Sequence, residues 1–392
     1  MIERYRPDLH LATWMRWLMT GGGGASQVQG DFIRSLGSYH QDKHPLVFMN
    51  ARSGIYAYFN HLRHRVGRGA VLIPAQICPV VPYAIRACGF AVRFIDLDDR
   101  YPSPSPGQYL DELTEETVAV VISPLYGYLP GGFQDFGQSL REVKIFLDMA
   151  QGLLLADLLD PQLLQRADAL VYSFALGKGV DTGGGLLLTK DRLEVSGYRV
   201  QKKIHYLPIL SQVMLLRFLI ISNLYPVFLK RLEREIEVDK EEALAKYPRK
   251  LAPTEIFSLW QAKLQVFAGD IQRARKRAVR LSKSALVQQA CDSSFFDGSA
   301  IHLRQVLRFR DVRLRDPVMQ SLRRDGVDCA PAGEALPSEY FAEKDLPDFP
   351  KARAFRQESL RLPFLGRLCE REFQQLQQTL EVALAQHLSQ RV

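Results

Sequence analysis

Residues 169–189 read ALVYSFALGKGVDTGGGLLLT: an apolar run, a loop of small residues and a second apolar run. Short apolar runs bounded by glycines are typical of strands that are buried on both faces. The sequence therefore predicts strands at Ala169–Ser173 and Gly184–Thr189, with the loop at one end of a sheet. Lys178 lies in this loop, where packing gives little reason for a lysine. It is either a solvated loop residue or a reactive amine, because Schiff-base chemistry needs an amine that can lose its proton.

The pattern continues toward the N-terminus. Between residues 50 and 190, short apolar runs alternate with helical stretches, as in an α/β fold whose mostly parallel sheet is covered by helices. The other expected strands are Ala70–Ile73, Ala91–Asp96, Val118–Ile122 and Lys144–Asp148, and the helical or connecting segments between strands are Asn60–Val66, Val80–Cys88, Gly137–Val143 and Pro161–Ala167.

Length and composition predict an ordered protein with one large domain and a smaller appendage. The chain has 392 residues, 47% hydrophobic and 24% charged, so it can bury a large core and lacks the polar bias of disordered chains. We expect an N-terminal arm and helix at 1–45, a large domain at 46–253 with an apolar insert at about 195–250, and a linking helix with a small C-terminal α+β domain at 254–392. Within the last part the pattern predicts a helix at Thr254–Ser282, a strand at Ile301–Phe309, and helices at Arg315–Asp325 and Arg371–Leu388.

The net charge of +8 favours anionic partners, which include phosphorylated ligands, nucleic acid and anionic membranes. The basic residues are interspersed with acids and apolar residues at helical spacing, as on solvated helix faces. No zinc-finger or RNA-binding motif accompanies them. We therefore expect no nucleic-acid partner.

The five cysteines form no CxxC pair, which indicates a reducing compartment without a disulfide framework or a zinc site. Arg4, Arg6 and Asp8 precede any apolar run, so the N-terminus lacks the layout of a secretory signal. We expect a cytoplasmic protein that binds no metal.

The segment Leu207–Leu229 is rich in apolar residues and has basic flanks. Pro208, Arg217 and Pro226 interrupt it, which disfavours a membrane-spanning helix. Two alternatives stay open at this point: a buried or dimer-forming helical hairpin, and a helix that lies on a membrane surface.

Two further features lie near predicted strand ends, and ligands of open α/β sheets bind outside the carboxyl ends of strands. Residues 52–55, Arg-Ser-Gly-Ile, precede a helix expected to start near Tyr56. A hydroxyl and exposed N–H groups there suit a phosphate, although Ser-Gly before a helix is also an ordinary cap. Asp148 ends an apolar strand, either as a turn residue or as a carboxylate that pairs with a protonated pyridine nitrogen. Ser173, five residues before Lys178, is placed to reach a phosphate.

Together these features resemble the DegT/StrS-type sugar aminotransferases, a branch of the fold type I enzymes that use pyridoxal 5'-phosphate (PLP). That family has a Ser/Asn-Gly-Thr loop, an acid-Asp-Ala-Ala-Gln motif, and a Ser-Phe-x-x-x-Lys loop before a Gly-Gly strand. This chain has Ser53-Gly54, then Asp-Met-Ala-Gln at 148–151, then Ser173-Phe174 with Lys178 in register. The similarity runs from about residue 45 to the carboxyl end.

The resemblance implies a seven-stranded-type sheet, PLP as cofactor and a homodimer. It implies that Lys178 holds PLP as a Schiff base and transfers protons, and that Asp148 pairs with the pyridine nitrogen. It places Gln151 near the ring hydroxyl, Cys78 beside the ring, Ser53, Gly54, Ile55 and Ser173 around the phosphate, and Arg249 at the phosphate of the partner subunit.

The chain departs from the family pattern in several places: among them, the asparagine that the family has near residues 247–250 is missing, and the stretch from about 195 to 250 is longer and more apolar. Cys78 stands where the family has an aromatic residue that stacks on the ring, Ile55 replaces a threonine, and Pro124 replaces a histidine. Lysine at position 178, where related sugar dehydratases carry histidine, favours amino transfer. The resemblance thus implies transfer from an amino donor, glutamate, to a nucleotide- or lipid-linked keto-sugar in surface polysaccharide or glycoconjugate biosynthesis. The alternative is a degenerate PLP-fold protein with a binding or regulatory role in the same kind of pathway.

Overall fold

The computed structural model describes residues 2, 25–37, 40, 42–133, 136–140, 142–154, 159–195, 198–200, 215, 218, 250–252, 256–296, 300–341 and 346–389. Arg249 and almost all of the apolar segment 207–229 lie outside these residues. Of that segment, Leu215 and Phe218 are described, and both side chains are exposed. Among the described helices, none is both long and apolar enough to cross a membrane.

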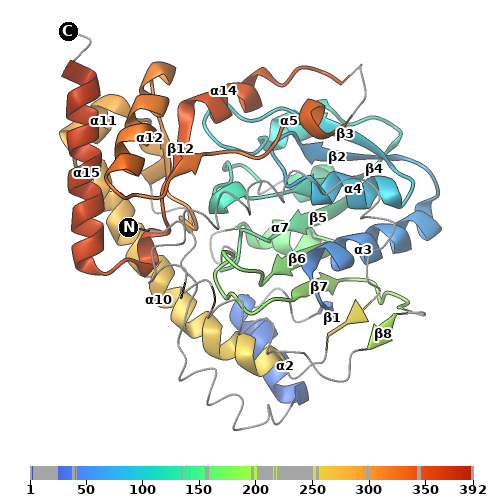
Figure 1. The fold of residues 1–392 in the computed structure, drawn as a ribbon. Coiled ribbons are helices and arrows are strands. Elements are labelled where there is room, and N and C mark those ends of the chain that lie inside the picture. The colour runs from blue at the N-terminus through green and yellow to red at the C-terminus, as the bar shows by residue number, and fades with distance from the viewer. Residues whose placement is uncertain are drawn as a thin grey trace.

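A mixed, mostly parallel sheet lies at the centre of the molecule (Figure 1). Its strands in the described residues are β1 (His44–Phe48), β2 (Ala70–Pro74), β3 (Ala91–Ile95), β4 (Thr117–Ile122), β5 (Lys144–Asp148), β6 (Ala169–Ser173), β7 (Gly185–Thr189), β8 (Arg199–Val200) and β9 (Lys250–Leu251). Their order is β3-β2-β4-β5-β6-β7-β1-β9-β8. Strands β2 to β6 pair in parallel, whereas β7 runs antiparallel to both β6 and β1. Since β8 and β9 are two-residue extensions, the seven longer strands confirm the expected fold class.

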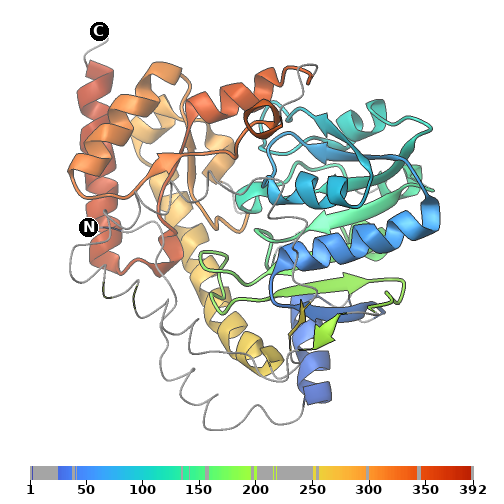
Figure 2. The same ribbon diagram turned by 45° about the vertical axis from the view of Figure 1, so that its right-hand side comes forward.

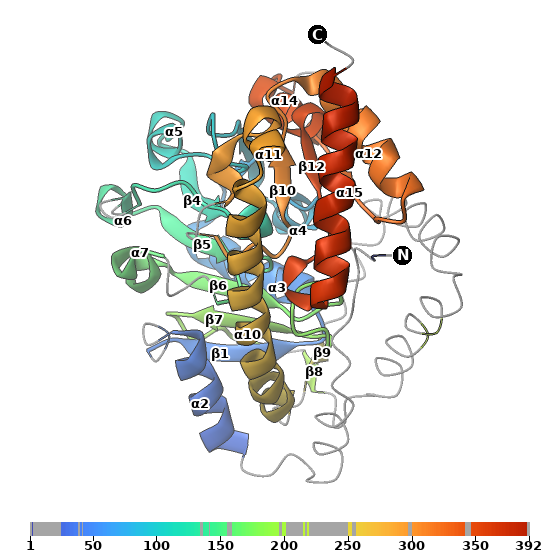
Figure 3. The same cartoon turned by 90° about the vertical axis from the view of Figure 1, so that its left-hand side faces the viewer.

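Alternate residues of the strands point to opposite faces, and helices cover both faces. Leu72 and Val120 pack in one apolar cluster with α2 (Ala25–Leu36), α7 (Pro161–Arg166) and α10 (Ile256–Ser282). Val71 and Val121 pack in another with α3 (Ala51–Val66) and α4 (Val80–Ala87). Figure 3 shows α2 and α10 in front of the strands, with α3 and α4 behind them. Burial on both faces explains why these strands are continuous apolar runs.

A second sheet belongs to residues 285–389, which we call the C-terminal unit. Its three antiparallel strands are β10 (Val306–Arg308), β12 (Ser359–Arg361) and β11 (Ala330–Pro331), in that order. The long helix α10 runs from this unit along the sheet to α2 (Figures 1 and 2). The other helices described are α5 (Pro106–Asp111), α6 (Phe136–Ser139), α11 (Ala285–Ala290), α12 (Arg315–Arg324), α13 (Pro337–Tyr340), α14 (Pro350–Glu358) and α15 (Glu370–Ser389).

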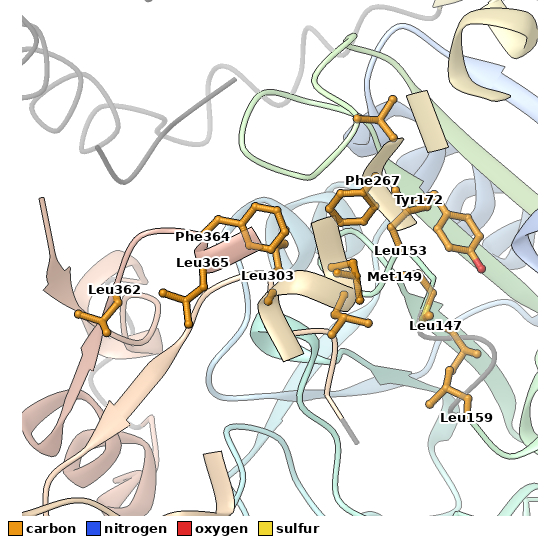
Figure 4. Packing of buried hydrophobic residues seen from close by; sticks show 14 of the residues in the cluster. Leu147, Met149, Leu153, Leu159, Tyr172, Phe267, Leu303, Leu362, Phe364 and Leu365 are labelled. Atoms are coloured by element: carbon orange, nitrogen blue, oxygen red, sulfur yellow. The ribbon is translucent and has the colours of Figure 1, made fainter. Parts of the chain in front are cut away.

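An apolar seam joins the C-terminal unit to the large sheet. Phe267 of α10 lies between Phe364 and Tyr172 in Figure 4, and its ring centroid is 6.0 Å from that of Phe364. Leu303 and Leu365 are buried in the same cluster. Burying such a side chain contributes about 1.5–3 kcal/mol relative to exposing it. The seam therefore fixes the C-terminal unit beside the loops that follow β5 and β6.

The expected strand at Ile301–Phe309 is wrong over its first half, because only Val306–Arg308 form a strand. His302 has a positive φ of 48° and its Nδ1 lies 3.0 Å from the Tyr128 hydroxyl. Gln305 turns its side chain inward and donates to the Phe295 carbonyl oxygen at 2.8 Å. These buried polar contacts replace the ladder hydrogen bonds that the apolar pattern predicts.

Candidate active site

Asp148 is the last residue of β5 and is buried, with 5% of its surface exposed. One carboxylate oxygen accepts a hydrogen bond from the Ala150 N–H at 3.1 Å. Burial raises the pKa of this carboxyl, while the Ala150 N–H and the positive charge of Lys178 act in the opposite direction. A buried acid near a lysine at the carboxyl edge of a parallel sheet has the electrostatic character of a functional group.

Lys178 lies in the loop between β6 and β7 and is half-buried. Gly177 and Gly179 flank it with φ angles of 79° and 108°, which favour glycine. The charge of Lys178 acts on both Asp148 and Cys78, so the three side chains share one electrostatic neighbourhood. The structure thus brings together the lysine and the acid that the sequence singled out.

The helix after β1 begins at Ala51, so the expectation that it starts near Tyr56 is wrong. Asn50 is the cap: its Oδ1 accepts from the Ser53 N–H and from the Ser53 hydroxyl, each at 3.0 Å. Asparagine is among the strongest N-cap residues, so this signal was present in the sequence. Ser53 therefore lies in the first turn of a 16-residue helix, where N–H groups suit an anion.

Ser53 and Ser173 lie near each other because two glycines let the helix approach the sheet. Ser173 pairs with Gly185 across β6 and β7, and Asn50 forms a bridge with Gly184. A Cβ on Gly185 would collide with the backbone of α3 at its first residue. The start of α3 and the carboxyl end of β6 thus present two buried hydroxyls at one corner of the site.

Gly54 and Ile55 contribute to packing in this structure. A Cβ on Gly54 would lie 3.3 Å from the Phe48 ring and 3.4 Å from Leu187 Cβ, so glycine allows α3 to lie close to β7. Ile55 is 3% exposed and belongs to the core between α3 and the sheet. Their expected contact with a phosphate stays a prediction.

Gln151 is held by the turn that follows β4. Its Oε1 accepts from the Tyr126 N–H at 3.1 Å, which fixes how the amide lies. Tyr126 is buried with a positive φ of 57°, and its hydroxyl accepts from the Gly333 N–H at 3.0 Å. The C-terminal unit therefore reaches the site through Gly333.

Glu334, the next residue, was missed by the sequence analysis. Its N–H donates to Gln76 Oε1 at 2.5 Å, and its charge acts on Asp148 and Cys78. Burial raises the pKa of the Cys78 thiol to about 11, with Glu334 adding to the effect, so the thiol is protonated at neutral pH. No motif marks Glu334, because a long-range contact of the C-terminal unit brings it to the site.

The donor set fits a ligand with a protonated ring nitrogen, a reactive carbonyl and a phosphate. Asp148 offers a buried carboxyl, Lys178 an amine, and Ser53 and Ser173 hydroxyls beside a helix start. Among the described residues, Gln76 Nε2 is a buried donor without a hydrogen-bond partner. Polar groups of this kind in one place indicate a binding site more than a structural core.

Residues 16–204 match the family model described as the DegT/DnrJ/EryC1/StrS aminotransferase family. No curated protein sequence matches the chain.

Solved structures share the fold over almost the whole chain. The aminotransferase TlmJ from Streptoalloteichus hindustanus is 19% identical with a TM-score of 0.70, covering 99% of this chain and 100% of its own. DesI, solved in the presence of its TDP-sugar product, is 18% identical with a TM-score of 0.67, covering 100% and 95%. NtdA from Bacillus subtilis, with bound cofactor PMP, is 15% identical with a TM-score of 0.66, covering 96% and 81%. At these identities the likeness shows the fold.

Proposed function

Because residues 16–204 match the family model described as the DegT/DnrJ/EryC1/StrS aminotransferase family, we propose that the protein is a PLP-dependent sugar aminotransferase. The observation that carries this proposal is the neighbourhood of Lys178 and the buried carboxyl of Asp148 at the carboxyl ends of β5 and β6. Those are the two groups that such chemistry requires from the protein. The similar structure with bound PMP, the aminated form of PLP, supports the same cofactor.

PLP, when bound, supplies an electron sink for the bonds broken at the substrate carbon. Asp148 would hold a positive charge on the ring nitrogen, because its carboxyl is buried at the carboxyl end of β5. Lys178 is the residue that would hold the cofactor through its Nζ, and the same amine would move the proton that amino transfer requires. Ser53 and Ser173 would hold the phosphate through their hydroxyls, beside the first turn of α3.

The acceptor that we propose is a nucleotide-linked keto-sugar, and the amino donor is glutamate. DesI, of the same fold, was solved with a TDP-sugar product, which supports this class of acceptor. A lipid-linked sugar is the second candidate, motivated by the apolar segment 207–229. We propose a role in surface polysaccharide or glycoconjugate biosynthesis from the resemblance alone.

The assay that tests this proposal incubates PLP-loaded protein with glutamate and TDP-linked keto-sugars. We expect release of 2-oxoglutarate and a sugar product that carries nitrogen from labelled glutamate, with Lys178→Ala as the inactive control. A parallel reaction with undecaprenyl-linked keto-sugar tests the lipid-linked acceptor. Cofactor that stays unchanged by glutamate, with no aminated sugar in either reaction, would contradict the proposal.

Two features of the proposal concern the assembly. We propose a homodimer in which Arg249 serves the phosphate of the partner subunit, and a peripheral membrane contact through 207–229. Both follow from the sequence. Light scattering tests the first, together with a loss of PLP affinity in Arg249→Ala. Cosedimentation with anionic vesicles tests the second.

The alternative is a binding or regulatory protein that keeps the fold without the chemistry. Cys78 motivates this alternative, because its small protonated thiol offers no ring to stack on the cofactor. The intact pair of Lys178 and Asp148 weighs against it, since a protein freed from catalysis gains nothing from a buried carboxyl that is paired, within the described part of the chain, with no cation in direct contact. Failure of folded protein to bind PLP would favour the alternative.

A further inference from the structure

The loop that carries Lys178 is folded around a buried aspartate. Asp181 has a positive φ of 56°, and its Oδ1 accepts from the Gly177 N–H at 2.6 Å. The N–H groups of Thr182 and Gly183 both donate to the Phe174 carbonyl oxygen, at 3.0 and 2.8 Å. The loop therefore closes on itself, with the carboxylate of Asp181 inside it.

Arg367 of the C-terminal unit enters this loop. Its side chain is 8% exposed and forms an ion pair with Asp181, whose side chain is 0% exposed. It forms a second ion pair with Asp270 of α10, with 3.1 Å from Nε to Oδ2. A third hydrogen bond runs from its guanidinium to the carbonyl oxygen of Gly179, the residue after Lys178. One buried arginine thus joins the lysine loop, α10 and the C-terminal unit.

The other side of Lys178 is held in the same way. Arg304, also from the C-terminal unit, is 7% exposed and donates to the carbonyl oxygen of Gly177 at 3.2 Å. The carbonyl oxygens of both residues that flank Lys178, Gly177 and Gly179, therefore each accept a hydrogen bond from an arginine of the C-terminal unit. The ring of Phe267 packs closely against Gly179, where an added Cβ would lie 2.6 Å from the ring.

We propose that Arg367 is a positioning residue for Lys178, acting through Asp181 and the Gly179 carbonyl oxygen. Buried ion pairs are often no more stabilising than apolar side chains of the same size, because the charges lose their hydration. We therefore attribute the buried network around Arg367 to the positions in which it holds the atoms of the Lys178 loop. The docking of the C-terminal unit then sets the direction of Lys178. This inference rests on the proposed function, because it takes Lys178 as the residue that bonds to PLP.

The test compares wild type with Arg367→Lys, which keeps the charge but cannot bridge Asp181, Asp270 and the Gly179 oxygen together. The full-length protein is titrated with PLP, and borohydride reduction followed by peptide mass analysis measures the fraction of Lys178 that carries the cofactor. We expect the PLP dissociation constant to rise roughly tenfold, as displacement of a reacting group by a fraction of an ångström predicts, with less labelled Lys178.

Arg273→Lys is the matched control. Arg273 also pairs with Asp270, and it donates to the Gly366 carbonyl oxygen, but its contacts lie outside the lysine loop. It should keep wild-type affinity and labelling. Asp181→Asn is the second variant, since it retains the acceptor for the Gly177 N–H and loses the ion pair. It should weaken PLP binding in the same direction, and it decides the question if Arg367→Lys does not fold.

The outcomes separate this inference from the proposed function. Wild-type protein that never acquires PLP on Lys178 would overturn the proposed function and the inference with it. If wild type is labelled and both loop variants match its affinity and labelling, only the inference fails. It also fails if Arg367→Lys lowers the melting temperature alone, or if Arg273→Lys reduces labelling as strongly.

Discussion

Asp148 and Asp168 belong to neighbouring parallel strands but lie at opposite ends of them. Asp148 is the last residue of β5, and Asp168 immediately precedes β6. Both are buried. Asp168 accepts hydrogen bonds from Lys144 Nζ at 3.0 Å, from Arg166 Nη1 at 3.0 Å and from the Ile145 N–H at 2.9 Å. The described residues supply Asp148 with one hydrogen bond, from the Ala150 N–H.

We propose that the difference separates a structural carboxylate from a functional one. Two cations and a backbone donor compensate the charge of Asp168, so contacts within the fold account for its burial. No cation among the residues that the structure describes is in direct contact with Asp148, and burial raises its pKa. A carboxyl left in this condition at a ligand-binding edge is suited to a positive group that arrives with the cofactor. The two residues therefore respond differently to the same substitution.

Asp148→Asn should produce the largest effect on activity. The amide keeps the size and an acceptor for the Ala150 N–H but cannot hold a positive charge on the ring nitrogen. We expect kcat to fall about 10²–10³-fold, in the range found for loss of one preorganised electrostatic group. Melting temperature should stay the same or rise. Turnover with saturating PLP checks this, and near-wild-type kcat would remove Asp148 from the mechanism.

Asp168→Asn should have the opposite effects, lowering the stability and leaving the activity nearly unchanged. It leaves Lys144 and Arg166 without their carboxylate partner, so we expect a loss of about 1–3 kcal/mol in the free energy of unfolding. Activity of the folded protein should change little, because the substitution lies at the edge opposite to Lys178. Urea unfolding and a PLP titration on the same sample measure both effects. A strong loss of PLP affinity at unchanged stability would contradict the structural role of Asp168.

The pH dependence of stability should differ between cofactor-free wild type and Asp148→Asn. Because burial raises the pKa of Asp148, the folded protein holds this proton more tightly than the unfolded chain does. The contribution of this proton to the free energy of unfolding is therefore complete below pH 3.8, the ordinary pKa of the group. It is lost as the pH rises through the raised pKa of the folded protein. The stability of Asp148→Asn relative to wild type should therefore increase as the pH rises through this range. A difference that is flat with pH would mean that burial does not shift this carboxyl.

The sequence predicted the strands that carry Asp148 and Ser173 better than it predicted the surroundings of these residues. Asp148 and Ser173 end apolar runs whose buried strands the structure confirms, because burial on both faces leaves a local pattern. Asn50 was overlooked although N-cap preference marks it. Glu334 and Arg367 could not be predicted, since each reaches the site through the docking of the C-terminal unit. The half-strand error at Ile301–Phe309 has the same cause: buried polar contacts of His302 and Gln305 override an apolar pattern.

We propose above all that Lys178 bonds to PLP beside the buried carboxyl of Asp148. The visible absorption spectrum of purified protein with PLP tests it most directly, comparing wild type with Lys178→Ala before and after adding glutamate. We predict a cofactor band in wild type that glutamate bleaches and that Lys178→Ala lacks. The same band in both proteins, or in neither, would contradict the claim.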